Sequence, residues 1–245
     1  NRKEWFGCYS AMQMINSTSV AVYHTSSSPE VEWILGNSDS KIIFVGHNPN
    51  DNGEESKMPI VRLLSIIDNI ESLEKVVLMG DDIEAVKSGK IISWDAFINK
   101  GENISDDEIL NSLNSIDASD TTSLIYTSGT TGNPKGVELT HNNFKVELDS
   151  VGQVLKFGQG DRYVSWLPLA HVFGQLVDNH HWVRRAMHMY VVDSPLNTID
   201  YAKEVQPHLF ISVPRIYEKV YSNLKAAINS KAILKLGLKI PGLSS

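Results

Sequence analysis

Short apolar runs alternate with helical patterns in this chain, and that alternation constrains its fold more than any other feature. Residues 41–45 and 76–79 predict strands, while residues 59–67 between them predict a helix. Strands separated by helices are typical of architectures in which helices cover the faces of a sheet. We therefore predict an α/β fold.

Signals for helix ends divide the rest of the chain in a similar way. Ser28 before Pro29 predicts the start of a helix that ends near Gly36, and Thr140 predicts the N-cap of a helix over residues 141–155. The polar segment 101–122 is the best internal boundary, so we predict one α/β subdomain over residues 1–120 and a second region over residues 121–245. Further strands are predicted at residues 124–126, 137–139, 163–167 and 209–213, and a further helix from residue 214 to about residue 228.

The charge balance limits the class of ligand. With 22 Lys and Arg against 29 Asp and Glu, the net charge of −7 argues against a nucleic-acid-binding surface. An anionic ligand must therefore be held by local geometry. The single cysteine, Cys8, cannot form an internal disulfide, and no apolar run approaches the roughly 18 residues of a membrane span.

Residues 127–136 combine four hydroxyl side chains, three glycines and one lysine between two predicted strands. Glycines let backbone N–H groups converge on an anion, hydroxyls donate to phosphate oxygens, and Lys135 adds a charge-assisted hydrogen bond. The lysine follows Gly132 by three residues and precedes Gly136, so the spacing differs from that of a Walker A loop. We interpret the segment as a polyphosphate-binding loop; a polar surface turn is the plainer alternative.

The segment YTSGTTGNPKG at residues 126–136, followed by LTHNN, resembles the signature of the adenylate-forming superfamily, which includes acyl-CoA synthetases, luciferases and peptide-synthetase adenylation domains. The resemblance implies that the loop binds the phosphates of ATP, that Lys135 is catalytic and that Thr127 helps to hold Mg²⁺. It also implies that the chain is a central part of a large N-terminal α/β domain with mixed and parallel sheets flanked by helices. The residues implied at the ATP phosphates are Thr127, Ser128, Gly129, Thr130, Thr131, Gly132 and Lys135.

Two further segments bear on the acid substrate. Residues 166–174 resemble a superfamily motif whose histidine lines the acyl site. His171 matches that histidine, and the resemblance implies that His171 is catalytic. Without the resemblance, a histidine beside a proline-containing turn is more often a structural residue. Residues 213–219 resemble a segment of long-chain and bubblegum-type fatty acyl-CoA synthetases, which implies a fatty acid substrate. Read by itself, that segment is only a helix start.

The sequence also departs from the superfamily pattern. His208 stands where a threonine is usual, and residues 183–188 carry Arg184 and Arg185 in place of a glycine-containing turn. These changes concern the shape of the acyl pocket rather than the ATP loop. The other histidines, including His180, His181 and His188, lack metal-ligand spacing, so we predict no metal site built by the protein alone.

The resemblance implies an AMP-forming long-chain fatty acid–CoA ligase that uses ATP, Mg²⁺ and CoA to make an acyl-adenylate and then an acyl-CoA. We expect the parent protein to be the enzyme and this chain to be a fragment without the small C-terminal domain. Two alternatives stay open: another adenylate-forming ligase, of the aryl or acyl-carrier type, and a non-catalytic nucleotide-binding fragment. The expected partners are small molecules, the family allows peripheral membrane contact, and the expected location is the cytoplasm or a membrane surface.

Overall fold

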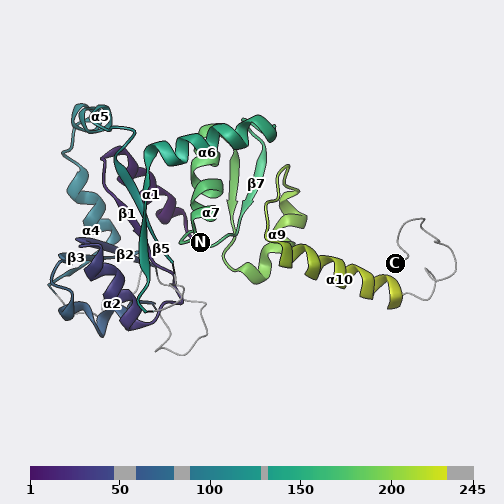
Figure 1. Cartoon of the computed structure of the whole chain (residues 1–245), viewed down its shortest axis with the longest axis horizontal. Coiled ribbons are helices and arrows are strands. Elements are labelled where there is room, and N and C mark those ends of the chain that lie inside the picture. The colour runs from purple at the N-terminus through teal and green to yellow at the C-terminus, as the bar shows by residue number, and fades with distance from the viewer. Residues whose placement is uncertain (47–58, 80–88, 128–131, 231–245) are drawn as a thin grey trace. The chain divides into compact units, whose positions relative to one another are not determined.

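The computed structural model of this chain describes residues 1–46, 59–79, 89–127 and 132–230 (Figure 1). These belong to two compact units, residues 1–208 and residues 209–245. The first unit holds three small sheets with helices between their strands, which confirms the predicted α/β fold. Within the described ranges, no helix combines the length and apolarity needed to cross a membrane.

The first sheet has the strand order β1-β5-β6. β1 (Ser19–Ala21) runs parallel to β5 (Thr121–Thr127), and β5 runs antiparallel to β6 (Lys135–Thr140). α1 (Lys3–Met14) contacts this sheet through Gln13, whose side-chain amide donates to the Thr122 carbonyl at 3.3 Å. Because β1 and β5 lie on either side of residue 120 and share a sheet, the predicted boundary at 120/121 passes through a compact unit.

The second sheet is entirely parallel, with the order β2-β3-β4. Its central strand carries Val76 and Val77, both with no exposed surface, and α2 packs against it through Leu35. Fully burying such a side chain stabilises the fold by about 1.5–3 kcal/mol. The strands of this sheet are β2 (Ile42–Gly46), β3 (Lys75–Met79) and β4 (Ile91–Ser93). The helices and 3₁₀ turns in the same stretch of chain are α2 (Ser28–Asn37), α3 (Pro59–Leu64), η2 (Ile67–Asn69), α4 (Trp94–Ile98), η3 (Asn99–Gly101) and α5 (Asp106–Asn114).

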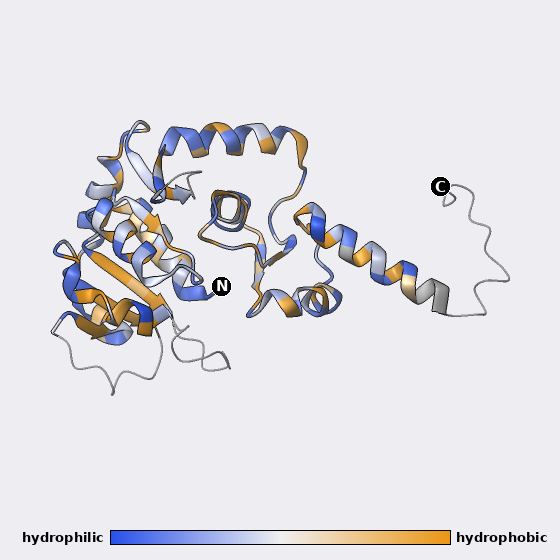
Figure 2. Cartoon of the chain, turned by 60° about the horizontal axis from the view of Figure 1, so that its bottom comes forward, coloured by the Kyte–Doolittle hydropathy of each residue, from blue (hydrophilic) through white to orange (hydrophobic). Residues whose placement is uncertain are grey.

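The third sheet pairs β7 (Arg162–Ser165) in parallel with β8 (His188–Val191). The connection between them is one helical segment made of α7 (Val172–Gly174), a π-helix η4 (Gln175–His181) and α8 (Trp182–Arg185). It packs against α6 (His141–Val154), where blue and orange alternate in Figure 2, as expected for a helix with one buried face. η5 (Pro195–Asn197) and α9 (Thr198–Val205) complete the first unit.

The predicted cap of α6 is confirmed, and the predicted cap of α2 is displaced by one residue. Thr140 accepts the Asn143 N–H at 3.2 Å as the N-cap of α6. The N-cap of α2 is Ser27, whose backbone N–H donates to Glu30, because the Ser28 hydroxyl instead donates to the Arg62 carbonyl at 3.2 Å.

The strand predicted at residues 209–213 is wrong. Within the described part of the chain this segment forms only an isolated bridge at Leu209, since an apolar run needs a neighbouring strand to become part of a sheet. The helix predicted after it is confirmed as α10 (Pro214–Ser230).

Candidate active site

The pairing of β5 with β6 brings two candidate site residues together. The antiparallel register sets Thr127, the last residue of β5, opposite Lys135, the first residue of β6. Residues directly opposite in such a pair have Cβ atoms about 4.5–5.5 Å apart and share a face of the sheet. Both side chains are exposed, so a hydroxyl and an ammonium stand side by side at the open end of a hairpin. Ser128, Gly129, Thr130 and Thr131 lie outside the described residues.

Two glycines of the motif have structural reasons to be glycine. Gly132 has a φ of +96°, a conformation that L side chains rarely adopt. Gly136 lies opposite Tyr126, and a Cβ added there would come within 3.0 Å of the tyrosine ring. The ring of Tyr126 therefore lies directly over the start of β6.

The structure adds two residues of α2 that sequence reasoning missed. The indole N–H of Trp33 donates to the Pro134 carbonyl at 2.9 Å, and the Tyr126 hydroxyl donates to the Asn37 side-chain carbonyl at 2.7 Å. Burial raises the pKa of Tyr126, which keeps its hydroxyl a donor. The only sequence signal was the spacing of Trp33 and Asn37, four residues apart on one helix face, and it does not reveal what that face contacts.

His171 lies on a different element from the hairpin. It is the N-cap of α7, where its Nδ1 accepts the Phe173 N–H at 3.1 Å, so the proton of the neutral ring is on Nε2. Gly174 allows the tight turn before it, because a Cβ there would come within 2.4 Å of the Pro168 carbonyl oxygen. Among the described residues, the structure records no direct contact between His171 and Thr127 or Lys135.

A largely apolar groove begins beside His171. It has a volume of about 360 Å³ and lies between the end of β6, α6 and the start of the 172–185 helical segment. Such a groove suits an aliphatic or aromatic group better than a charged one. Its lining consists of Leu139, Asn143, Phe144, Glu147, Val172, Phe173 and Leu176.

Comparison with known proteins identifies the family. The model of the AMP-binding enzyme family matches residues 1–240. The chain belongs to this family. A long-chain-fatty-acid–CoA ligase of Xenopus laevis is 26% identical over 244 residues, 96% of this chain and 31% of the relative. A probable CoA ligase of Humulus lupulus is 30% identical over 247 residues, 96% of this chain and 35% of the relative.

A solved structure shows the same fold. The coronafacic acid ligase of Pectobacterium brasiliense superposes with a TM-score of 0.72 at 18% identity, over 92% of this chain and 41% of that one. The chain thus spans about a third of the length of the curated relatives it matches, and less than half of this solved structure.

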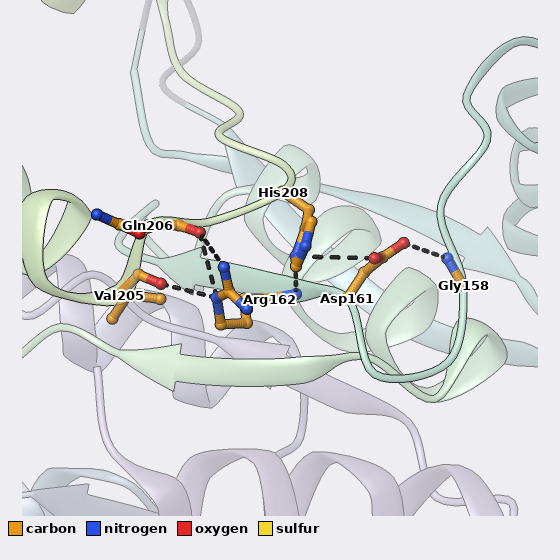
Figure 3. A network of polar contacts seen from close by, with 6 residues as sticks. All are labelled: Gly158, Asp161, Arg162, Val205, Gln206 and His208. Atoms are coloured by element: carbon orange, nitrogen blue, oxygen red, sulfur yellow. Dashed lines mark hydrogen bonds and ion pairs between the residues drawn. The ribbon is translucent and has the colours of Figure 1, made fainter.

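The departures from the family pattern have local structural roles. The His208 Nδ1 accepts a hydrogen bond from the backbone N–H of Arg162 at 2.9 Å and lies 3.7 Å from an Asp161 carboxylate oxygen (Figure 3). The Arg162 guanidinium donates to the backbone carbonyls of Val205 and Gln206 at the end of α9. Arg184 forms an ion pair with Asp149 at 2.6 Å. Ala186 has a φ of +50°, so the backbone keeps a left-handed conformation that favours glycine.

The π-helix carries a buried carboxyl that sequence reasoning also missed. Asp178 is fully buried and accepts hydrogen bonds from the hydroxyls of Tyr163 and Ser165 on β7, the latter at 2.6 Å. Burial raises the pKa of Asp178 to about 7, although both hydrogen bonds oppose the shift.

His180 is a second titratable residue of the π-helix whose pKa is shifted. Burial is the main cause that lowers the pKa of His180 to about 4, and the nearby His141 and His181 contribute to the shift. The His180 Nε2 lies 2.9 Å from the Tyr9 hydroxyl oxygen.

The turn before α7 generates the first prediction. Gly174→Ala should lower the free energy of unfolding by about 1–3 kcal/mol, because the new methyl group overlaps a backbone carbonyl that cannot rotate away. Gly7→Ala in α1 is the matched control, since a Cβ there meets nothing within 4 Å, and it should be neutral or slightly stabilising. Urea denaturation of both variants measures the difference, and equal effects would contradict this account of Gly174.

Asp178 and His180 should give stability opposite dependences on pH. Between pH 3.8 and about 7 the unfolded Asp178 is ionised while the folded one is protonated, so its contribution to stability falls as pH rises. Between about pH 4 and 6.5 the unfolded His180 is protonated while the folded one is neutral, so its contribution rises with pH. Each slope has an upper limit of about 1.4 kcal/mol per pH unit.

Urea denaturation from pH 4 to 7 tests both groups. In Asp178→Asn, the free energy of unfolding should rise more steeply with pH than in the wild type. In His180→Gln, which keeps an acceptor for the Tyr9 hydroxyl, the free energy of unfolding should fall as pH rises. Wild-type slopes in both variants would refute the assigned pKa shifts.

Proposed function

We propose that the parent protein of this chain is an AMP-forming ligase that activates a long-chain fatty acid with ATP and passes the acyl group to CoA. The observation that carries the proposal is the pairing of Thr127 with Lys135 at the open end of the β5–β6 hairpin. An ammonium and a hydroxyl on one face, next to a glycine with positive φ, suit a polyphosphate. Membership of the AMP-binding enzyme family supports the same reading.

In this proposal each hairpin residue has a distinct role. The Lys135 ammonium makes a charge-assisted hydrogen bond to a phosphate oxygen and stabilises the negative charge that builds on the departing pyrophosphate. The Thr127 hydroxyl would help to hold the Mg²⁺ that accompanies ATP. Mg²⁺ takes oxygen ligands and usually keeps only one or two from protein, the rest coming from phosphates and water, so a single exposed hydroxyl fits it. Bound there, Mg²⁺ neutralises phosphate charge.

The proposed reaction has two transfers. A carboxylate oxygen of the acid attacks the α-phosphorus of ATP, the bond from that phosphorus to the bridging oxygen breaks, and pyrophosphate leaves. The sulfur of CoA then attacks the acyl carbon, its proton is released, and AMP departs from the mixed anhydride. The first step moves negative charge onto the departing pyrophosphate, which is the charge that Lys135 is positioned to stabilise.

The acid would be bound on the His171 side. His171 directly precedes Val172, which lines the apolar groove, so in this proposal the carboxylate accepts from the His171 Nε2–H while the acyl chain occupies the groove along Phe144 and Leu176. The relative named as a long-chain-fatty-acid–CoA ligase, matched along 96% of this chain, supports a fatty acid as the substrate.

Replacing Lys135 tests the ATP site. In the full-length protein, Lys135→Ala should reduce acid-dependent ATP–pyrophosphate exchange by about tenfold to a hundredfold, because it removes a charge-assisted contact of roughly 1.5–3 kcal/mol. Lys145→Ala is the matched control: it removes an exposed lysine of α6 whose recorded partner is Asp149, and exchange should stay at the wild-type rate. Full exchange in Lys135→Ala would rule out the assigned role.

The choice of acid needs its own experiment. Pyrophosphate release by the full-length protein should be stimulated by a long-chain saturated fatty acid and much less by benzoic acid. Leu176→Arg places a cation in the groove and should weaken the response to the fatty acid, as a rise in its KM, while leaving the KM for ATP unchanged. A preference for the aromatic acid would favour an aryl ligase, and release with neither acid would favour a non-catalytic protein.

A further inference from the structure

We propose that Trp33 and Asn37 are positioning residues that hold the end of β5 and the start of β6, and with them Thr127 and Lys135, in the arrangement that binds the phosphates of ATP. The proposal rests on the function proposed above. Neither residue touches a substrate in this scheme. Each acts through the backbone or side chain of a hairpin residue next to Thr127 or Lys135.

One of the two hydrogen bonds reaches the end of β5, and the other reaches the residue before β6. Asn37 accepts from the Tyr126 hydroxyl at 2.7 Å, and Tyr126 directly precedes Thr127. Trp33 donates to the Pro134 carbonyl at 2.9 Å, and Pro134 directly precedes Lys135. Trp33 and Asn37 are four residues apart and therefore lie on the same face of α2. One helix face thus holds the entry and the exit of the loop.

The helix that provides this face is itself fixed in place. The opposite side of α2 is buried, with Val31 at 8%, Ile34 at 4% and Leu35 at 2% exposure, and two of these residues belong to the core of the second sheet. The Ser28 hydroxyl adds a hydrogen bond to the Arg62 carbonyl of α3. α2 therefore holds the hairpin of the first sheet against the packed core of the second sheet.

The exposure of Trp33 argues for positioning rather than core packing. Its side chain remains 39% exposed, so burial of its ring contributes only part of what a core tryptophan contributes. Its N–H is nevertheless bonded to a loop carbonyl 101 residues away instead of to water. Thr127 and Lys135 lose less entropy on binding a ligand when the strand ends that carry them are already held in place, so these two bonds should raise the affinity for phosphate.

The test measures the Kd of MgATP for the full-length protein by isothermal titration calorimetry. Trp33→Phe keeps a ring and loses the N–H, and Asn37→Ala loses the acceptor; each should raise the Kd about threefold to tenfold, as expected for one net hydrogen bond. Trp94→Phe is the matched control: it alters a tryptophan of α4, whose ring contacts Phe44 of β2, and should leave the Kd unchanged. A purely structural role would instead lower the thermal unfolding temperature at an unchanged Kd.

A double-mutant cycle isolates the Asn37–Tyr126 bond. Tyr126→Phe should weaken MgATP binding about as much as Asn37→Ala, and the double variant should be no weaker than either single one, because all three lack the same bond. Additive effects would overturn the assignment of Asn37.

A Lys135→Ala titration separates the two levels of inference. If it weakens binding while Trp33→Phe and Asn37→Ala do not, the positioning role is wrong and the proposed function stands. If the full-length wild-type protein does not bind MgATP, or Lys135→Ala binds as the wild type does, the assignment of the hairpin as the ATP site fails, and the positioning role fails with it.

Discussion

The antiparallel register between β5 and β6 is the constraint on which the candidate site depends. A slip of one residue would turn every β6 side chain to the other face of the sheet, and Lys135 would no longer stand beside Thr127. Gly136 favours that register, because a Cβ there would come within 3.0 Å of the Tyr126 ring opposite it, and the ring would have to shift to make room. The glycine after the lysine thus has a role in strand pairing, which the phosphate-binding interpretation of the motif does not require.

The location of the hairpin within the first unit explains how so exposed an element is held. Both candidate residues are exposed, and β6 is an edge strand among the described residues, so burial contributes little to holding Thr127 and Lys135 in place. The hydrogen bonds from α2 reach the hairpin from the side of the second sheet, where Val31 and Leu35 of α2 belong to the buried core. Residues that bind phosphate must leave their polar groups available to the ligand, so the position of Thr127 and Lys135 has to come from contacts made by their neighbours.

The sequence predicted the elements whose signals are local. The strands β2 and β3 are apolar runs, and the Thr140 cap bonds to a residue only three positions away. The phosphate-loop residues were likewise recognisable as a compact motif. The bonds of Trp33 to Pro134 and of Asn37 to Tyr126 were not predictable, because 101 and 89 residues separate the partners and no local pattern encodes the approach. The false strand at residues 209–213 has the same origin: apolarity is local, whereas a ladder partner is not.

The polar groups of the π-helix follow a related logic. An apolar residue in place of Asp178 would leave the buried hydroxyls of Tyr163 and Ser165 without a partner, and each such hydroxyl costs about 1–3 kcal/mol of stability. The replacement would cost little only if both hydroxyls were removed as well. The carboxyl therefore specifies one alignment of the helical segment on β7. A shift by one residue would separate all three groups. Because His171 caps the start of this same segment, the alignment that satisfies Asp178 also determines where the His171 ring lies beside the groove. A buried carboxyl with a raised pKa can thus contribute to orienting the candidate acyl site while reducing stability at neutral pH.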